Sequence, residues 1–195
     1  MSRDMTRREA LRRTAGLLGG VVSTPVWSGL LSGCSAPGGD WSPSVLTPDQ
    51  VDTVRRMADL IIPETDTPGA VAAGVHRFVD TLLADGFAAA DREAFLAGLD
   101  DLDARCQNAY EATFVDLEPP LQKAVVAEMD DETFGAGAAE WHPDRPPFFR
   151  VMKELTLVGY YTSEIGASQE LKINVVPGRY DGVVPFDEIG RAWST

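Results

Sequence analysis

The sequence predicts an all-α fold, a single small helical bundle of about five helices followed by an extended C-terminal tail. Two observations predict this class. Apolar residues recur at spacings of three and four in five separate segments, which is the period of an amphipathic helix. Proline, glycine and capping residues punctuate the chain between these segments. About 160 residues follow the N-terminal leader, a length that suits one compact domain.

The first predicted helix begins after Thr47 and ends before Pro63. Thr47 suits the N-cap and Pro48 the first helical position, and Gln50 can close a capping box by reaching back to the N-cap amide. The apolar residues at helical spacing in this segment are Val51, Val54, Met57, Ala58 and Ile61. Because proline cannot continue a helix, Pro63 ends the segment.

Two further helices are expected between residues 75 and 110. The first, after a Pro-Gly loop, has these apolar residues on one face: Val75, Phe78, Val79, Leu82 and Leu83. The second runs from about 88 to 110 with these residues inward: Phe95, Leu99, Leu102 and Cys106. Asp100, Asp101 and Asp103 fall on its solvated side, because the glycine and distal glutamate of an EF-hand loop are missing.

The fourth and fifth helices are each opened by a proline pair. Pro119 and Pro120 precede a helix with these apolar residues: Val125, Val126 and Met129. A loop containing Trp141 and His142 follows over 135–147. The last helix runs from about Phe148 to Ile165, and the tail from Glu170 to Thr195 is expected to be extended, without an independent fold.

The last helix carries two apolar stripes. The first comprises Phe148, Val151, Met152, Leu155 and Val158, and the second comprises Phe149, Leu157, Tyr160 and Tyr161. A helix that is apolar over most of its circumference is either central to its bundle or shared with a partner, and both readings stay open. Arg150 and Glu154 are spaced for an i, i+4 ion pair on the remaining strip.

The first 33 residues are typical of an export signal. Arg7 and Arg8 precede an apolar run rich in small residues, a pattern that resembles a bacterial twin-arginine signal for folded proteins. The glycines, serines and Pro25 of this run disfavour a stable spanning helix, and an uncleaved amphipathic anchor is the alternative. We therefore expect the protein on the periplasmic side of the inner membrane or in the cell envelope.

The leader ends in a possible lipidation site. Leu31-Ser32-Gly33-Cys34 resembles the lipobox of bacterial lipoproteins, in which Cys34 becomes the first mature residue and takes lipid on its sulfur. Ordinary cleavage after Ala36 is the alternative. Residues 34–45, rich in serine, proline and glycine, predict a flexible tether to a helical domain over 46–195.

Charge excludes one class of partner. Beyond residue 33 the chain holds 12 basic and 28 acidic residues. A surface this acidic repels phosphate backbones and anionic headgroups. The sequence therefore predicts no nucleic-acid partner, and membrane attachment only through lipid or another protein.

The sequence offers no motif for chemistry. It contains no dinucleotide-binding glycine pattern after a strand, no phosphate-binding loop and no haem-attachment motif. Cys106 is expected to be a buried, inert thiol, since no histidine is placed to activate it. His76 and His142 are not spaced as metal ligands, and Glu154 and Glu164 lie nearly three helical turns apart. We therefore predict no catalytic, cofactor-binding or metal-ligating residue in this chain.

Five motifs follow one another along the body. They are Leu46-Thr47-Pro48, Ala58–Ala70, Ala73-Gly74-Val75, Lys153–Gly166 and Val176–Gly182. Their combination resembles the gluconate 2-dehydrogenase subunit 3 family over about residues 46–186. The twin-arginine-like leader also fits this family, whereas the lipobox-like Cys34 is not a general requirement of it.

The resemblance implies a non-catalytic small subunit that associates with a large dehydrogenase of the glucose-methanol-choline type, often alongside a haem c subunit. The large subunit would hold FAD and a sugar or sugar acid. The small subunit would support its maturation, its export by the twin-arginine translocase and its membrane attachment. The family has no agreed catalytic motif, so no catalytic residue is carried over. A free-standing, lipid-anchored envelope binding or scaffold protein is the alternative.

A contact surface for the large subunit is also expected. It comprises the second stripe of the last helix, Phe149, Leu157, Tyr160 and Tyr161, together with a turn containing Pro177, Arg179, Tyr180 and Asp181. Burial of large aromatic side chains supplies most of the affinity in such interfaces. A plain structural turn is the alternative for the second segment.

Overall fold

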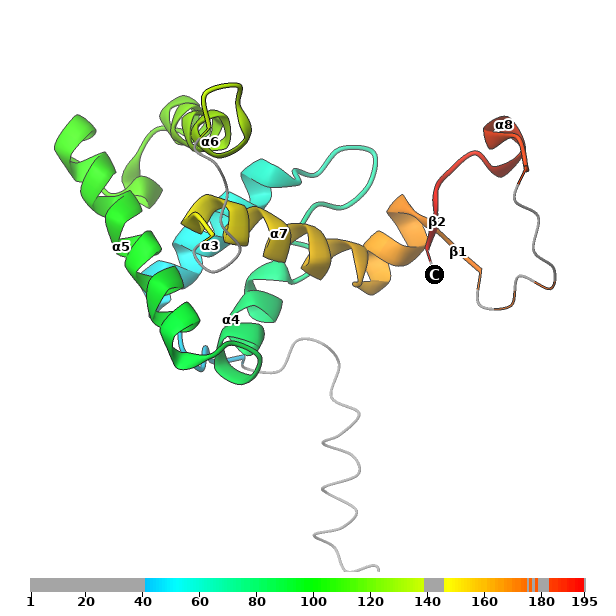
Figure 1. Cartoon of the computed structure of the whole chain (residues 1–195), viewed down its shortest axis with the longest axis horizontal. Helices are drawn as coiled ribbons and strands as arrows, with labels where there is room; N and C mark the ends of the chain where they lie inside the picture. The colour runs from blue at the N-terminus through cyan, green and yellow to red at the C-terminus, as the bar shows by residue number, and fades with distance from the viewer. Residues whose placement is uncertain (1–40, 139–145, 175, 177, 179–182, 195) are drawn as a thin grey trace, which may run out of the picture. The chain divides into compact units, whose positions relative to one another are not determined.

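The computed structural model describes residues 41–138, 146–174, 176, 178 and 183–194. Of the two units into which the chain divides, the second comprises Pro43–Thr195. The described part of the second unit contains the five expected long helices (Figure 1), which are α3 (Pro48–Ile61), α4 (Val75–Asp85), α5 (Ala89–Tyr110), α6 (Pro119–Phe134) and α7 (Phe148–Tyr161). The predicted all-α bundle is confirmed.

Helix α3 begins with the predicted capping box. The Gln50 amide donates to the Thr47 hydroxyl oxygen at 3.3 Å, and the Thr47 amide donates to the Gln50 side-chain oxygen at 3.1 Å. These bonds satisfy two amides that a helix start would leave open, and Pro48 has no amide to satisfy. The helix ends at Ile61, two residues before Pro63.

The start of the folded body is fixed by a buried carboxylate on α4. Asp80 is fully buried, and its Oδ2 accepts a hydrogen bond from the Ser44 amide at 2.7 Å. Its Oδ1 accepts from the amides of Val45 at 3.0 Å and Leu46 at 2.9 Å. The predicted tether over 34–45 is therefore too long at its C-terminal end, because the amides of residues 44 and 45 are bonded within the body. Its residues 34–40 lie outside the described part of the chain.

Helix α5 buries the four predicted residues, and its aspartates differ from one another. Asp100 and Asp101 are exposed, as expected for a solvated side. Asp103 is half-buried, and its Oδ1 accepts from the Phe114 amide at 2.9 Å. This bond satisfies the first amide of the short 3-10 helix η1 (Phe114–Asp116), so Asp103 helps to hold the α5–α6 connection.

A second link between α5 and α6 is ionic. Arg105 of α5 lies 3.0 Å from Glu128 and 2.8 Å from Glu132, both on α6. Its hydrogen bond lowers the pKa of the Glu132 carboxyl and, in return, raises the pKa of the guanidinium. Both carboxylates are more than half exposed, so solvent screens this pair.

Helix α7 lies at the centre of the bundle. It contacts α3, α4, α5 and α6, and it runs through the middle of the helices in Figure 1. Two glycines allow this close packing. A Cβ atom at Gly98 of α5 would lie 2.4 Å from the Phe148 ring, and one at Gly159 of α7 would lie 2.7 Å from the Phe78 ring. Of the two readings for a helix apolar on most sides, the central position is the one adopted.

The hydrophobic core is contributed mainly by α3, α4, α5 and α7. Its fully or nearly fully buried members include Val54, Met57, Val75, Val79, Leu83, Phe95, Leu99, Leu102, Cys106, Phe114, Val125, Phe149, Met152 and Tyr160. One contiguous core supports the prediction of a single packed helical domain.

The segment after α7 is more structured than predicted. The helix ends at Tyr161 rather than near Ile165, and a π-helical turn η2 (Gly166–Glu170) follows. A short helix α8 (Phe186–Ile189) separates two strands, β1 (Lys172–Ile173) and β2 (Trp193–Ser194). The strands pair in parallel, with Lys172 opposite Trp193. The tail therefore folds back on itself instead of being wholly extended.

Candidate interaction surfaces

The predicted contact stripe on α7 is divided between core and surface. Phe149 is 3% exposed and Tyr160 is 1% exposed, whereas Leu157 is 37% and Tyr161 is 39% exposed. The Tyr160 hydroxyl donates to the Pro68 carbonyl oxygen at 2.8 Å, so its polar end also has a partner within the chain. Val158, assigned to the first stripe, is exposed as well.

This division corrects half of the expected interface. Phe149 and Tyr160 pack inside the chain's own bundle, because neighbouring helices cover these two positions of α7. They have no surface left to offer a partner. Leu157 and Tyr161 keep exposed apolar surface, and Tyr161 packs edge-on against Tyr160 with ring centroids 5.3 Å apart.

The other expected recognition residues lie outside the described part of the chain. These are the turn residues Pro177, Arg179, Tyr180 and Asp181, the signal residues Arg7 and Arg8, and the lipidation candidate Cys34.

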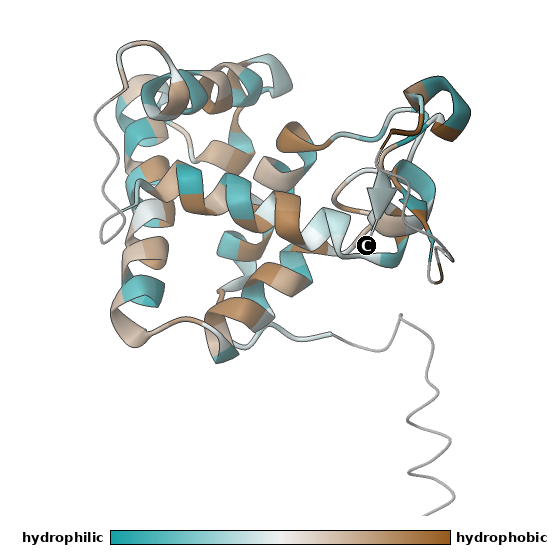
Figure 2. Ribbon diagram, turned by 45° about the vertical axis from the view of Figure 1, so that its right-hand side comes forward, coloured by the Kyte–Doolittle hydropathy of each residue, from teal (hydrophilic) through white to brown (hydrophobic). Residues whose placement is uncertain are grey.

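Among the described residues, the most exposed group of apolar side chains follows α7. We use the name C-terminal arm for the described residues 171–174, 176, 178 and 183–194. Its described members include Val183, which is 91% exposed, Val176 at 79%, Phe186 at 68%, Ile173 at 53% and Trp193 at 43%. Figure 2 shows apolar ribbon around α8, and in both views α8 stands apart from α3–α7. The sequence analysis placed a contact turn in this segment, at Pro177, Arg179, Tyr180 and Asp181, but missed the apolar residues on either side of it, because valine and phenylalanine in a tail carry no positional signal.

The base of the arm is held to the bundle. The Thr67 hydroxyl, in the loop after α3, donates to the Glu170 carboxylate at 2.6 Å. Arg191 donates to the carbonyl oxygen of Gln169, and the Lys172 ammonium lies 3.4 Å from the Ile189 carbonyl oxygen. Lys172 also lies 4.8 Å from the centre of the Trp193 ring. Both cations are thus engaged in bonds that fold the arm.

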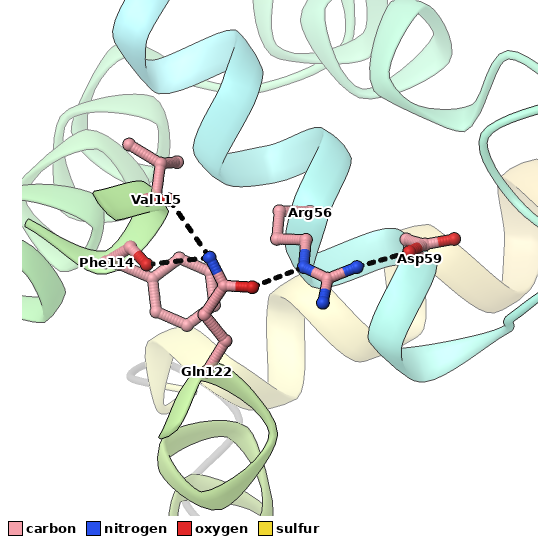
Figure 3. Close-up of polar contacts among 5 residues, drawn as sticks. All are labelled: Arg56, Asp59, Phe114, Val115 and Gln122. Carbon is pink, nitrogen blue, oxygen red and sulfur yellow. Dashed lines mark hydrogen bonds and ion pairs between the residues drawn. The ribbon is translucent and has the colours of Figure 1, made fainter. Parts of the chain in front are cut away.

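A polar junction joins α3, η1 and α6 (Figure 3). Gln122 is 5% exposed, and its Nε2 donates to the carbonyl oxygens of Phe114 and Val115, each at 3.1 Å. Its Oε1 accepts from Arg56 Nε at 2.6 Å, and Arg56 Nη1 donates to Asp59 at 2.6 Å. All the polar atoms of the Gln122 amide group are therefore used in holding elements together.

A shallow hollow of about 400 Å³ lies beside this junction. It is lined by Asp52, Arg55, Arg56, Asp59, Glu64, Val71 and Ala72. Carboxylates and guanidiniums largely compensate one another there, and the lining contains no thiol, hydroxyl or imidazole that could act as a nucleophile. The hollow offers charge of both signs but no activated group.

The described thiol and imidazole both have shifted pKa values. Burial, followed by the charge of Asp103, raises the pKa of the Cys106 thiol, so the thiolate is disfavoured. Burial lowers the pKa of His76, and the charges of Arg55 and Arg77 lower it further, against an opposing effect of Asp52. His76 is consequently neutral at pH 7. His142 lies outside the described residues.

Two searches over the described residues were negative. Within 41–138, 146–174 and the described part of the arm, no group of three or more histidine, cysteine or acidic side chains is arranged to hold a metal ion. No helix of the same residues has the length and apolar character needed to cross a membrane.

Comparison with known proteins gives one match. A family model described as gluconate 2-dehydrogenase subunit 3 matches residues 48–178, well over half of the chain. The matched range spans α3 to β1 and continues into the arm. No curated protein and no solved structure matches the chain.

Proposed function

Because the chain belongs to the gluconate 2-dehydrogenase subunit 3 family, we propose that it is the non-catalytic small subunit of an exported flavoprotein dehydrogenase acting on sugars or sugar acids. The family match is the observation that carries this proposal. In the proposed complex the large subunit, of the glucose-methanol-choline type, binds both FAD and substrate, and a haem c subunit passes electrons onward where one is present.

The chemistry of the described residues supports a role without catalysis. The thiol of Cys106 is buried with a raised pKa, and His76 is neutral and flanked by arginines. The hollow beside Arg56 is lined by charges that compensate one another. The buried thiol is disfavoured as a thiolate nucleophile, and the lining of the hollow contains no nucleophilic side chain.

The proposed work of the chain is to mature, export and attach its partner. Arg7 and Arg8 direct the folded pair to the twin-arginine translocase, and lipid on Cys34 retains the pair on the periplasmic side of the membrane. The large subunit then needs no signal of its own. Because an acidic body is repelled by anionic headgroups, attachment through lipid is the mode that its charge favours.

Part of the expected contact surface remains in this proposal. Leu157 and Tyr161 on α7, both more than a third exposed, contact the large subunit together with the turn residues Arg179, Tyr180 and Asp181. Aromatic side chains at such a surface contribute a large apolar area with few torsions to fix.

Deletion of this chain in a host that expresses the large subunit tests the proposal. The periplasmic fraction is assayed for dehydrogenase activity and flavin absorbance. We expect the large subunit to become apo, to stay in the cytoplasm or to be degraded, and expression of the wild-type chain to restore it. Unchanged secretion and activity of the large subunit after deletion would refute the accessory role.

Two variants separate export from attachment. Arg7→Lys combined with Arg8→Lys is expected to keep both subunits in the cytoplasm, because the twin-arginine pair is the export address. Cys34→Ala is expected to leave export intact and to move the complex from the membrane fraction to the soluble fraction. A complex that stays membrane-bound in the Cys34→Ala strain would remove the lipid anchor from the proposal without affecting the rest.

A further inference from the structure

We propose that the C-terminal arm is the principal surface by which this chain binds the large dehydrogenase subunit, an inference that rests on the proposed function. It places the main contact after α7 rather than on α7 itself. Leu157 and Tyr161 then form the edge of the interface.

The first support is the concentration of exposed apolar side chains in the arm. Val183, Val176 and Phe186 are each more than two thirds exposed, and Ile173 and Trp193 add to them within 22 residues of chain. A monomeric soluble protein rarely leaves such a group of large apolar side chains in water, because each gains free energy by burial. The exposed apolar side chains of the arm are therefore of the kind that an interface buries at its centre.

Elsewhere in the described residues, six large apolar side chains are exposed, each by less than half. Three of these, Leu157, Val158 and Tyr161, lie on α7 at the edge of the proposed interface, and the other three lie on α5 and α6. Phe134 is 41% exposed, but Arg150 and Lys153 lie over its ring at 4.6 Å and 4.7 Å from the centroid. Tyr110 and Leu121 are 40% and 37% exposed and belong to different helices. Single residues of this kind are ordinary on protein surfaces.

Charge favours a different protein as the occupant. Residues 171–195 of the sequence carry three basic and three acidic residues, whereas the chain beyond residue 33 carries 12 and 28, so the excess negative charge lies outside this segment. Two copies of so acidic a body repel each other, which disfavours self-association. An anionic lipid surface is disfavoured for the same reason. The ammonium of Lys172 already bonds to Ile189 within the arm, and the guanidinium of Arg191 bonds to Gln169 of η2.

The base of the arm provides a place for an anchoring side chain. A hollow of about 420 Å³ lies between η2 and the arm, lined by Ser168, Leu171, Lys172, Ile173, Ile189, Gly190 and Arg191. Its aliphatic lining suits an apolar side chain of the partner, and the stems of the two cations extend the apolar wall. Hot spots of interfaces are commonly such side chains inserted into pockets.

The arm is also ordered before binding. The strand pair β1–β2, the Arg191 bond to Gln169 and the Thr67 bond to Glu170 fix its base against the bundle. Less conformational entropy is then lost when the partner binds.

The test uses the full chain co-expressed with the large subunit. Val183→Ser with Phe186→Ser removes exposed apolar surface from the arm, and Ser168→Phe fills the hollow from a position that is itself exposed. Tyr110→Ser with Leu121→Ser is the matched control, because it removes two exposed apolar side chains from other helices. Circular dichroism and the melting temperature verify that each variant is folded.

Both arm variants are expected to bind the purified large subunit at least about tenfold more weakly than the wild type, and the control less than about twofold more weakly. Binding by the arm variants at wild-type strength would overturn the arm inference while the proposed function stood. A wild-type chain that does not bind the large subunit would instead refute the proposed function.

Two further measurements show whether a membrane or a second copy of this chain covers the arm instead. Loss of binding to phosphatidylethanolamine–phosphatidylglycerol vesicles in the Val183→Ser, Phe186→Ser variant, with large-subunit binding unchanged, would overturn the proposal in favour of a membrane. A wild-type dimer in light scattering that becomes a monomer in the same variant, again with large-subunit binding unchanged, would overturn it in favour of a second copy of this chain.

Discussion

Replacing Asp80 with asparagine tests how the start of the folded body is held. The carboxylate is fully buried and accepts three backbone amides, from Ser44, Val45 and Leu46. Oδ1 takes two of them and Oδ2 takes the third, at 2.7 Å. In asparagine the carbonyl oxygen can keep the two amides of Oδ1, but the new NH₂ group faces the Ser44 amide, donor against donor.

The expected loss follows from that geometry. A hydrogen bond to a charged acceptor contributes about 1.5 to 3 kcal/mol, so losing the Ser44 bond should lower the free energy of unfolding by about 2 kcal/mol. Asp80→Ala leaves all three amides without this acceptor and should lower it by about 4 kcal/mol. Against a typical stability of about 5 to 15 kcal/mol, both changes are large.

Urea unfolding followed by far-UV circular dichroism measures the effect. With a slope of about 2 kcal/mol per molar urea, the midpoint of Asp80→Asn should fall by about 1 M. Asp85→Asn is the matched control, because it makes the same substitution at an exposed position of the same helix and should change stability by less than about 0.5 kcal/mol. Hydrogen exchange should also accelerate at the amides of residues 44–46. If Asp80→Asn is no less stable than Asp85→Asn, the carboxylate does not hold this segment.

Three further predictions concern a titrating group, a close contact and a buried amide. His76 in the folded chain has a pKa below its ordinary 6.5, so the unfolded chain binds the proton first as the pH falls. The free energy of unfolding therefore decreases below pH 6.5. In His76→Gln the melting temperature should fall less over this pH range, because the imidazole is missing. Gly98→Ala would place a Cβ atom 2.4 Å from the Phe148 ring, and the overpacking should exceed the gain in helix propensity, giving a net loss of about 1 kcal/mol in urea unfolding. Gln122→Met keeps the side-chain volume but deprives two carbonyl oxygens and Arg56 of partners, and should cost about 2 kcal/mol in the same assay.

Each of these has an outcome that contradicts its reasoning. If the melting temperatures of the wild type and His76→Gln change equally with pH between pH 5 and 7, protonation of the imidazole is not linked to folding. For Gly98→Ala, the double variant with Phe148→Leu should recover part of the loss, and strict additivity of the two changes would rule out the contact as its cause. A Gln122→Met protein as stable as the wild type would mean that water replaces the lost amide bonds.

Local sequence signals were sufficient to predict the helices. The capping box at Thr47 and Gln50 formed as expected, and the apolar period identified the buried residues of α5. The end of the last helix was less predictable. A Cβ atom at Gly166 would lie 2.0 Å from the Tyr160 carbonyl oxygen, so glycine permits the π-helical turn that follows α7. Such a contact depends on the three-dimensional course of the chain and leaves no periodic signal.

Long-range polar contacts were not predictable from the sequence. Asp80 stands among apolar residues of α4, and its three donors lie 34 to 36 positions earlier in the chain. Gln122 likewise joins segments that are distant in sequence, since Arg56 is 66 positions away. A buried polar residue is recognisable only when the groups that satisfy it are known.

The expected interface on α7 shows why an apolar stripe alone does not identify a partner surface. Periodicity reports that a face is buried, but Phe149 and Tyr160 are buried by the chain itself, and only Leu157 and Tyr161 remain exposed. A candidate partner surface is found by setting aside the apolar residues that the chain's own fold buries and keeping those that stay exposed. The apolar residues that stay most exposed lie in the arm. They follow no periodic pattern, and Val183 among them is 91% exposed. If this chain is a subunit, the surface that its own fold leaves uncovered is the one that its partner must bury.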